Sequence, residues 1–126
     1  MTWNIFFDAD QHDLLARFEG QLDAEGGRLS AAEFVKHIVG QPTRVIFDIR
    51  EMTGYEAAAR QHWQQALLPH RDNMKEIVIV GGGPLLRLGA SMIAVFLRVP
   101  LRNIPAEDSA EIAKIGDMLA PDNLDR

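Results

Sequence analysis

The chain opens on two short apolar runs separated by a polar stretch, a pattern that predicts a β-hairpin. Residues 3–8 are rich in aromatic side chains and predict a strand. Residues 14–18 predict a second strand, with Leu14, Ala16 and Phe18 on one face and Arg17 on the other. The polar stretch 8–13 is short enough to join the two strands as an antiparallel pair.

Helical periodicity follows the glycine pair at 26–27, which we assign to a loop. Ser30 and Glu33 have the spacing of a capping box, and Leu29 and Phe34 have the spacing of a hydrophobic staple. The apolar positions that follow share one face of a helix that stops at Gly40.

Two nearly continuous apolar runs, 44–49 and 77–80, predict strands that are buried on both faces. A second capping-box pattern, Thr53 to Glu56, predicts the start of a helix that Pro69 ends or kinks. Pro84 suits the first turn of a third helix, over residues 85–99.

The last part of the chain predicts a short edge strand and a final helix. Residues 100–104 form the strand, which their prolines confine to a sheet edge. Asp108 and Glu111 form a third capping-box pattern ahead of apolar residues at helical spacing. The order β-β-α-β-α-β-α-β-α predicts one α/β domain over residues 1–120, with a frayed tail at 121–126. We expect a mixed sheet with mostly parallel core strands and an antiparallel hairpin at the N-terminus.

Composition narrows the class of protein. The chain has 126 residues, 47% of them hydrophobic and 25% charged, as expected for one globular domain. It contains no cysteine, which fits a reducing compartment and excludes thiol chemistry. The net charge of −5 gives no electrostatic footprint for nucleic acid. The longest apolar segment, 85–99, is shorter than a membrane span, so we expect a cytoplasmic protein without an integral membrane segment.

The glycine run after the strand 77–80 is the strongest candidate for phosphate binding. Gly81 and Gly83 fit the first two positions of a dinucleotide fingerprint, but Leu86 occupies the third. A P-loop needs a lysine that this segment lacks, and Pro84 removes a backbone N–H donor. Two interpretations stay open: a tight turn that needs glycine, and an anion or partner site with Arg87 as its counter-charge.

The sequence gives only weak signals for a metal site or a catalytic site. The acidic residues between Asp8 and Glu19 mimic part of a calcium loop, but Asp13 stands where the loop needs glycine. The four histidines show no metal-ligand spacing, and no serine lies in a nucleophile-elbow motif. We therefore predict no catalytic residue, metal site or cofactor.

The predicted helix 85–99 is apolar over more than half of its circumference. Its polar positions Arg87, Ser91 and Arg98 follow one narrow stripe, with Ala94. A helix that covers one face of a sheet needs a narrower apolar stripe than this. The excess must contact a neighbouring helix, a partner chain or an apolar ligand. We predict self-association through a face that includes Leu85, Met92 and Phe96.

A binding rim is predicted where the two buried strands end, because the carboxyl ends of parallel strands meet at one edge of a sheet. The residues at these two ends are Thr53, Tyr55, Glu56, Gly81, Gly82, Gly83 and Arg87. The alternative role of Thr53 and Glu56 is to cap the following helix.

Three segments carry a resemblance to a known family. These are Val45-Ile-Phe-Asp-Ile49 with its turn and helix, Ile77-Val-Ile-Val-Gly-Gly81 with its helix, and Met52-Thr-Gly-Tyr55 through Arg60 and Trp63. With the opening hairpin they resemble the STAS family, and most closely its stand-alone SpoIIAA-like members related to anti-sigma factor antagonists. The resemblance covers nearly the whole chain and implies a non-catalytic protein-interaction module in regulation.

Regulatory STAS members switch partners when a Ser or Thr at the start of the helix after this strand is phosphorylated. An ungapped count from Asp48 places Glu56 or Ala57 near that position, and the family's Asp-Ser-Ser-Gly-like segment is absent. Thr53 lies a few residues early. One hypothesis is that Glu56 supplies a permanent negative charge there.

Three functional hypotheses follow. The first is a protein-interaction module with a protein partner or a second copy as its partner. The second is a binder of a small apolar or lipid-like ligand, because the family's fold also resembles lipid-transfer domains. The third is a nucleotide-binding protein or enzyme that uses the turn Gly81–Gly83.

Overall fold

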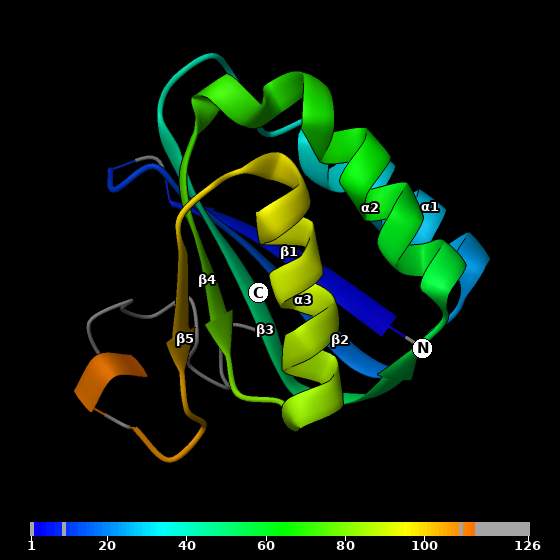
Figure 1. The fold of residues 1–126 in the computed structure, drawn as a ribbon. Coiled ribbons are helices and arrows are strands. Elements are labelled where there is room, and N and C mark those ends of the chain that lie inside the picture. Colours follow the sequence, from blue (N-terminus) through cyan, green and yellow to red (C-terminus); the bar gives the residue numbers. More distant parts are fainter. Residues whose placement is uncertain (1, 9, 109, 113–126) are drawn as a thin grey trace.

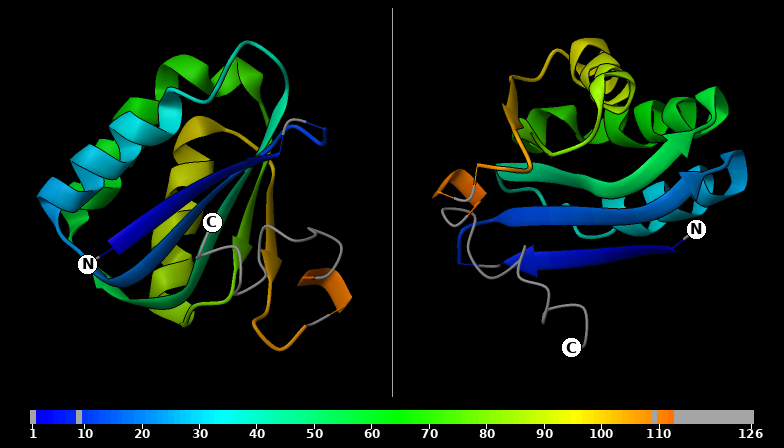
Figure 2. Two further views of the ribbon diagram at one scale, coloured as in Figure 1. Left: turned by 180° about the vertical axis from the view of Figure 1, so that it is seen from behind. Right: turned by 90° about the horizontal axis from the view of Figure 1, so that it is seen from below.

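The structure is a computed structural model that describes residues 2–8, 10–108 and 110–112. Figure 1 and Figure 2 show a twisted sheet with helices α1, α2 and α3 packed on one of its faces. The elements in chain order are β1 (Thr2–Asp8), β2 (Asp13–Leu22), α1 (Ala24–Val35), β3 (Thr43–Tyr55), α2 (Ala57–Leu67), the 3₁₀ helix η1 (Leu68–Asn73), β4 (Met74–Val80), α3 (Pro84–Leu97) and β5 (Leu101–Ile104).

The five strands are ordered β1-β2-β3-β4-β5. β1 pairs antiparallel with β2, and the other three pairs are parallel. This confirms the predicted mixed sheet with an N-terminal hairpin, and it confirms that β5 is an edge strand. Among the residues that the structure describes, no helix is long and apolar enough to cross a membrane.

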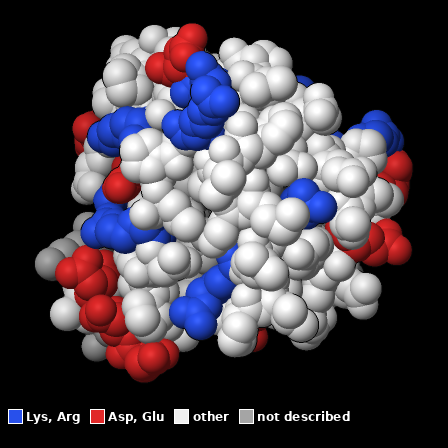
Figure 3. Space-filling model, in the orientation of Figure 1, with Lys and Arg blue, Asp and Glu red and all other residues white. Residues whose placement is uncertain are grey.

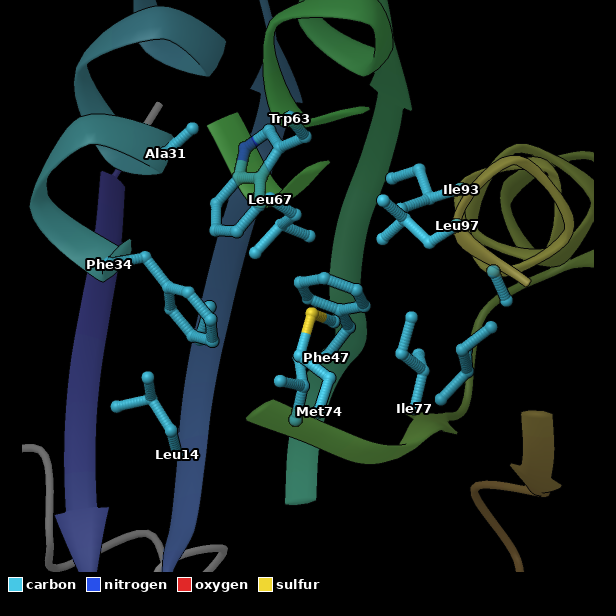
Figure 4. Packing of buried hydrophobic residues seen from close by; sticks show 14 of the residues in the cluster. Leu14, Ala31, Phe34, Phe47, Trp63, Leu67, Met74, Ile77, Ile93 and Leu97 are labelled. Carbon is cyan, nitrogen blue, oxygen red and sulfur yellow. The ribbon is translucent and has the colours of Figure 1, made fainter. Parts of the chain in front are cut away.

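The strands bury side chains on both faces, as the apolar runs predicted. Val45, Phe47 and Ile49 of β3 face the helices, where they join a large core with residues of β2, β4 and all three α-helices. Figure 4 shows this core, with Trp63 of α2 above Phe47 in this view and Phe34 of α1 to one side. The opposite face carries a smaller cluster, which Ile112 partly covers.

Helix α1 begins earlier than predicted. Its N-cap is Asp23, whose Oδ1 accepts a hydrogen bond of 2.7 Å from the Gly26 N–H. The glycine pair is therefore part of the helix, and its assignment to a loop was wrong. The helix ends at Val35, before the positive-φ Gly40 that was expected to stop it.

Contacts with α2 explain this error. A Cβ on Gly27 would lie 2.5 Å from the Cα of Ala59, so the glycine allows the two helix backbones to approach closely. Ser30 is fully buried, and its hydroxyl accepts a hydrogen bond from Trp63 Nε1. Ser30 is therefore not an N-cap. The predicted staple is also wrong, because Leu29 is exposed.

The second capping box was wrong as well. Thr53 belongs to β3, which runs several residues beyond its predicted end. The N-cap of α2 is Glu56, whose side chain makes no capping bond to its own helix. The prediction for Pro69 is confirmed, since α2 ends at Leu67 and η1 follows.

One of the two hydrogen bonds of the third predicted capping box is present. The Glu111 N–H donates to Asp108 Oδ1 at 3.1 Å. Most of the final helix, and the predicted tail at 121–126, lie outside the described residues.

Replacing Gly27 with alanine tests the close approach of α1 and α2. Helix propensity alone favours alanine by about 0.5–1 kcal/mol. We expect Gly27→Ala instead to lower the free energy of unfolding by about 1–3 kcal/mol, because the new Cβ overlaps Ala59. Urea denaturation measures the change. Gly54→Ala is the control, since a Cβ there meets nothing closer than 3.9 Å. A Gly27→Ala protein as stable as the wild type would contradict the packing.

Candidate functional site

One pocket opens between α2, α3 and the end of β3, on the helical side of the sheet. It has a volume of about 50 Å³, and its lining is apolar apart from one guanidinium and one phenol hydroxyl. The lining residues are Phe18, Leu22, Phe47, Ile49, Met52, Tyr55, Arg60, Trp63, Leu86, Gly89, Ala90 and Ile93. A concave apolar site with few polar groups is the usual form of a small-molecule site.

Irregular pairing of β3 with β2 aims its side chains into this pocket. In a regular strand, residues three apart face opposite sides of the sheet. Register shifts between Arg17 and Glu19, and between Gly20 and Gln21, each place an extra β3 residue opposite β2. Because β-bulges re-aim the side chains that follow them, Ile49, Met52 and Tyr55 all line the pocket.

The end of β3 extends beyond the ladder with β4. The β3–β4 pairing stops at Asp48 and Val80, whereas β2 remains paired with β3 as far as Tyr55. We call residues 51–55 the β3 overhang. It contains Met52 and Tyr55, which line the pocket together with residues of α2 and α3. The first turns of these two helices diverge (Figure 1).

The glycine turn has a structural cause in its contacts with β3. Gly81 and Gly82 have φ values of 74° and 83°, a left-handed conformation that favours glycine. A Cβ on either residue would lie 2.5 Å from a side-chain atom of β3, Arg50 Cγ for Gly81 and Ile49 Cδ1 for Gly82. Gly83 is the N-cap of α3 and has open space around it. Close packing against β3 therefore accounts for two of the three glycines.

A buried ion cluster lies on the opposite face, at the point of β3 where its pairing with β4 ends. Asp48 is 2% exposed and accepts hydrogen bonds from Arg17 Nε at 2.8 Å, Arg50 Nε at 2.9 Å and Arg50 Nη2 at 2.8 Å. The Arg17 guanidinium also lies 5.3 Å from the ring centroid of Phe6. The cluster joins β2 to β3 and holds Arg50 against the glycine turn.

The groups around Asp48 shift its pKa. Burial opposes the charged form, but the hydrogen bonds and charge of Arg50, with the hydrogen bond from Arg17, outweigh burial and lower the pKa of Asp48. The same pairing raises the pKa of Arg50. Asp48 is therefore a fixed anion with a structural role, and it lies on the face away from the pocket.

Glu56 links the two helices next to the pocket. Its Oε1 accepts a hydrogen bond of 2.6 Å from the N–H of Ala24, the first residue of α1. A carboxylate is favourable at this position because the N-terminus of a helix carries partial positive charge. Glu56 therefore caps a helix as predicted, but the helix is α1 and not α2. Its role as a permanent charge toward a partner stays a prediction.

The structure brings some residues of the predicted rim to the pocket and leaves others outside it. Tyr55 lines the pocket, and Gly82 borders it through Ile49 and Leu86. Thr53 is exposed on the β3 overhang, and Arg87 is half-buried on α3 outside the pocket lining.

Most pocket residues were absent from the predicted rim, and Arg60 and Gly89 are the two that most affect the chemistry and shape of the pocket. Arg60 contributes the guanidinium, and Gly89 allows Tyr55 to pack against α3, since a Cβ there would lie 2.3 Å from the Tyr55 hydroxyl. A glycine within a helix is unfavourable relative to alanine, so Gly89 was a usable signal of close approach. Within the described ranges, no group of three His, Asp or Glu side chains lies where it could hold a metal ion.

Asp48→Asn should destabilise the protein in a pH-dependent way. We expect a loss of about 3 kcal/mol at neutral pH, because two arginines lose a buried counter-ion. A lowered folded pKa means that the charge stabilises the fold fully above the unfolded pKa, about 3.9. This stabilisation disappears as the pH falls through the lower folded value. Urea denaturation of both proteins from pH 7 to acid should therefore show converging stabilities.

The exposed ion pair of Arg71 and Asp72 provides the control for this experiment. Asp72→Asn should leave the urea midpoint nearly unchanged. An Asp48→Asn deficit that stays constant across the pH range would contradict the assignment.

Glu56→Ala should lower the free energy of unfolding by about 1 kcal/mol, since α1 loses a hydrogen bond at its N-terminus. Glu56→Gln keeps an acceptor oxygen and should therefore lower the free energy of unfolding by a smaller amount. Denaturation midpoints of the two variants measure the difference. Equal losses would show that the charge, and not the hydrogen bond, stabilises α1.

Comparison with known proteins identifies the fold. No known sequence family and no curated protein matches the chain. Its structure is similar to that of an uncharacterised DUF3478-family protein with a SpoIIAA-like fold from Shewanella loihica PV-4. The TM-score is 0.64 and the identity 19%, and the match covers 88% of this chain and 90% of that chain.

A second similar structure is the anti-sigma factor antagonist SpoIIAA in its unphosphorylated form. Here the TM-score is 0.59 and the identity 14%, over 90% of this chain and 97% of that chain. Together with the mixed five-stranded sheet, these matches show that the chain has the SpoIIAA-like fold of STAS domains.

Proposed function

We propose that this chain is a non-catalytic protein-interaction module that self-associates through an exposed apolar face of α3. The SpoIIAA-like fold supports a regulatory role of the kind named for the anti-sigma factor antagonist. The lack of cysteine suits a reducing cytoplasm. The observation that carries the proposal is the surface of α3.

Five large apolar side chains of α3 lie open to solvent. We call them the α3 stripe; their exposed fractions are Leu85 78%, Leu88 57%, Met92 40%, Val95 74% and Phe96 41%. Steps of three and four residues place them on one side of the helix, from its first turn to its last. Contiguous exposed apolar surface of this kind marks an interaction site in many soluble proteins.

Among the described residues, neighbouring elements leave the side chains of the α3 stripe exposed. The opposite side of α3 carries Ile93, Ala94 and Leu97, which are buried against the sheet. Helix α2 reaches α3 through Gln64, whose Nε2 lies 3.4 Å from the carbonyl oxygen of Met92, yet the Met92 side chain stays exposed. Packing within the domain therefore accounts for only part of the excess apolar surface.

The charge pattern favours a second copy as the occupant. Arg87 is the one charged residue of α3, and it stands off the α3 stripe. Figure 3 shows a mostly uncharged area over α3, which Lys and Arg side chains border, with acidic side chains toward the margins of this view. An uncharged apolar stripe is complementary to itself, because two copies related by a two-fold axis bury it without leaving an unpaired charge.

Light scattering after size-exclusion chromatography tests the proposal. We expect the wild type to elute with the mass of two chains, and Leu88→Glu to raise the dissociation constant at least about tenfold by burying an unpaired carboxylate. Leu29→Glu is the matched control, since Leu29 is a similarly exposed leucine on α1. A wild-type protein that stays monomeric at high concentration would contradict self-association.

A further inference from the structure

We propose that the pocket between α2, α3 and the β3 overhang binds an unbranched aliphatic carboxylate. The chain end would enter the pocket, and the carboxylate would pair with Arg60. This site is separate from the α3 stripe, whose five members are absent from the pocket lining.

The pocket has the surface that an aliphatic chain requires. Ten of the twelve lining residues are hydrophobic or glycine, apart from Arg60 and the hydroxyl-bearing Tyr55. Trp63 and Phe47 form part of the wall and are 2% and 3% exposed. Filling such a site with methylene groups releases water from apolar surface, worth about 0.8 kcal/mol for each buried CH₂.

The volume restricts the shape of the ligand. At about 50 Å³, the pocket is smaller than the roughly 150 Å³ of an engineered apolar cavity that binds benzene. The end of a single unbranched chain therefore fits better than a ring or the two chains of a phospholipid.

Arg60 supplies the polar group at this site. Its Nη1 donates to Gln64 Oε1 at 3.1 Å, and no Asp or Glu among the described residues forms an ion pair with it. A guanidinium has five N–H donors, so most of its capacity remains available to a ligand. The planar fork of N–H groups matches the two oxygens of a carboxylate.

Gln64, one turn further along α2, orients the Arg60 guanidinium. Gln64 is 8% exposed and accepts from Arg60 while its own Nε2 donates to the Met92 carbonyl. The guanidinium is therefore held beside an apolar pocket by a residue that also contacts α3. A cation fixed at an apolar wall favours a ligand that carries an anion and a hydrocarbon chain together.

Calorimetric titration with octanoate tests the proposal. We expect saturable binding, with octanol and acetate each at least about tenfold weaker, because each lacks one of the two recognition elements. Arg60→Gln should weaken octanoate about tenfold and leave octanol unchanged. Arg98→Gln is the matched control, since Arg98 is an exposed arginine at the C-cap of α3.

Amide chemical shifts locate the bound chain. Octanoate should perturb the N–H signals of Gly89 and Tyr55 and leave that of the remote Gly40 unchanged. Absence of saturable binding would overturn the proposal, and so would equal affinity for octanoate and octanol, or an Arg60→Gln protein that binds octanoate as the wild type does. The Leu88→Glu protein should retain octanoate binding, which separates this site from self-association.

Discussion

The arrangement of the helices depends on the burial of Trp63. Its indole N–H donates to the buried Ser30 hydroxyl at 3.1 Å, and its ring packs edge-on against Phe18, Phe34 and Phe47. Losing the Ser30 acceptor would leave a buried donor unpaired, at a cost of about 1–3 kcal/mol. These contacts hold α2 close to α1, where the missing side chain of Gly27 gives it room. The distance left between α2 and α3 is the origin of the pocket.

The two faces of β3 have different roles because side chains alternate along a strand. On one face, Asp48 forms the ion cluster that fixes β2, β3 and Arg50. On the other, Ile49 contacts Gly82 and also lines the pocket. The glycine turn therefore fits tightly between a charged anchor and an apolar wall. This explains why a sequence that resembles a phosphate-binding loop needs its glycines for packing.

Local sequence signals predicted the sheet, the hairpin, the turn at Gly81 and the excess apolar surface of α3, because each depends on residues that are close in the chain. They failed at Ser30 and Thr53. The Ser30 hydroxyl accepts a hydrogen bond from Trp63, 33 residues away. Thr53 lies in the part of β3 that forms a strand because it pairs with β2. The pocket was beyond prediction from sequence because it depends on the spacing of two helices. Arg60 belongs to a segment that carries the family resemblance, but that segment did not mark it as a pocket residue, and only Gly89 gave a local sign of unusual packing.

The β3 overhang divides one strand into a part that builds the central ladder and a part that shapes the pocket. Residues 43–48 form the parallel ladder with β4, whereas residues 51–55 pair only with β2 within the described part of the chain. Met52 and Tyr55, which shape one wall of the pocket, lie in the second part. Substitutions there leave the central ladder intact. Changes at a few overhang positions therefore alter the wall of the pocket without altering any residue of the β3–β4 ladder.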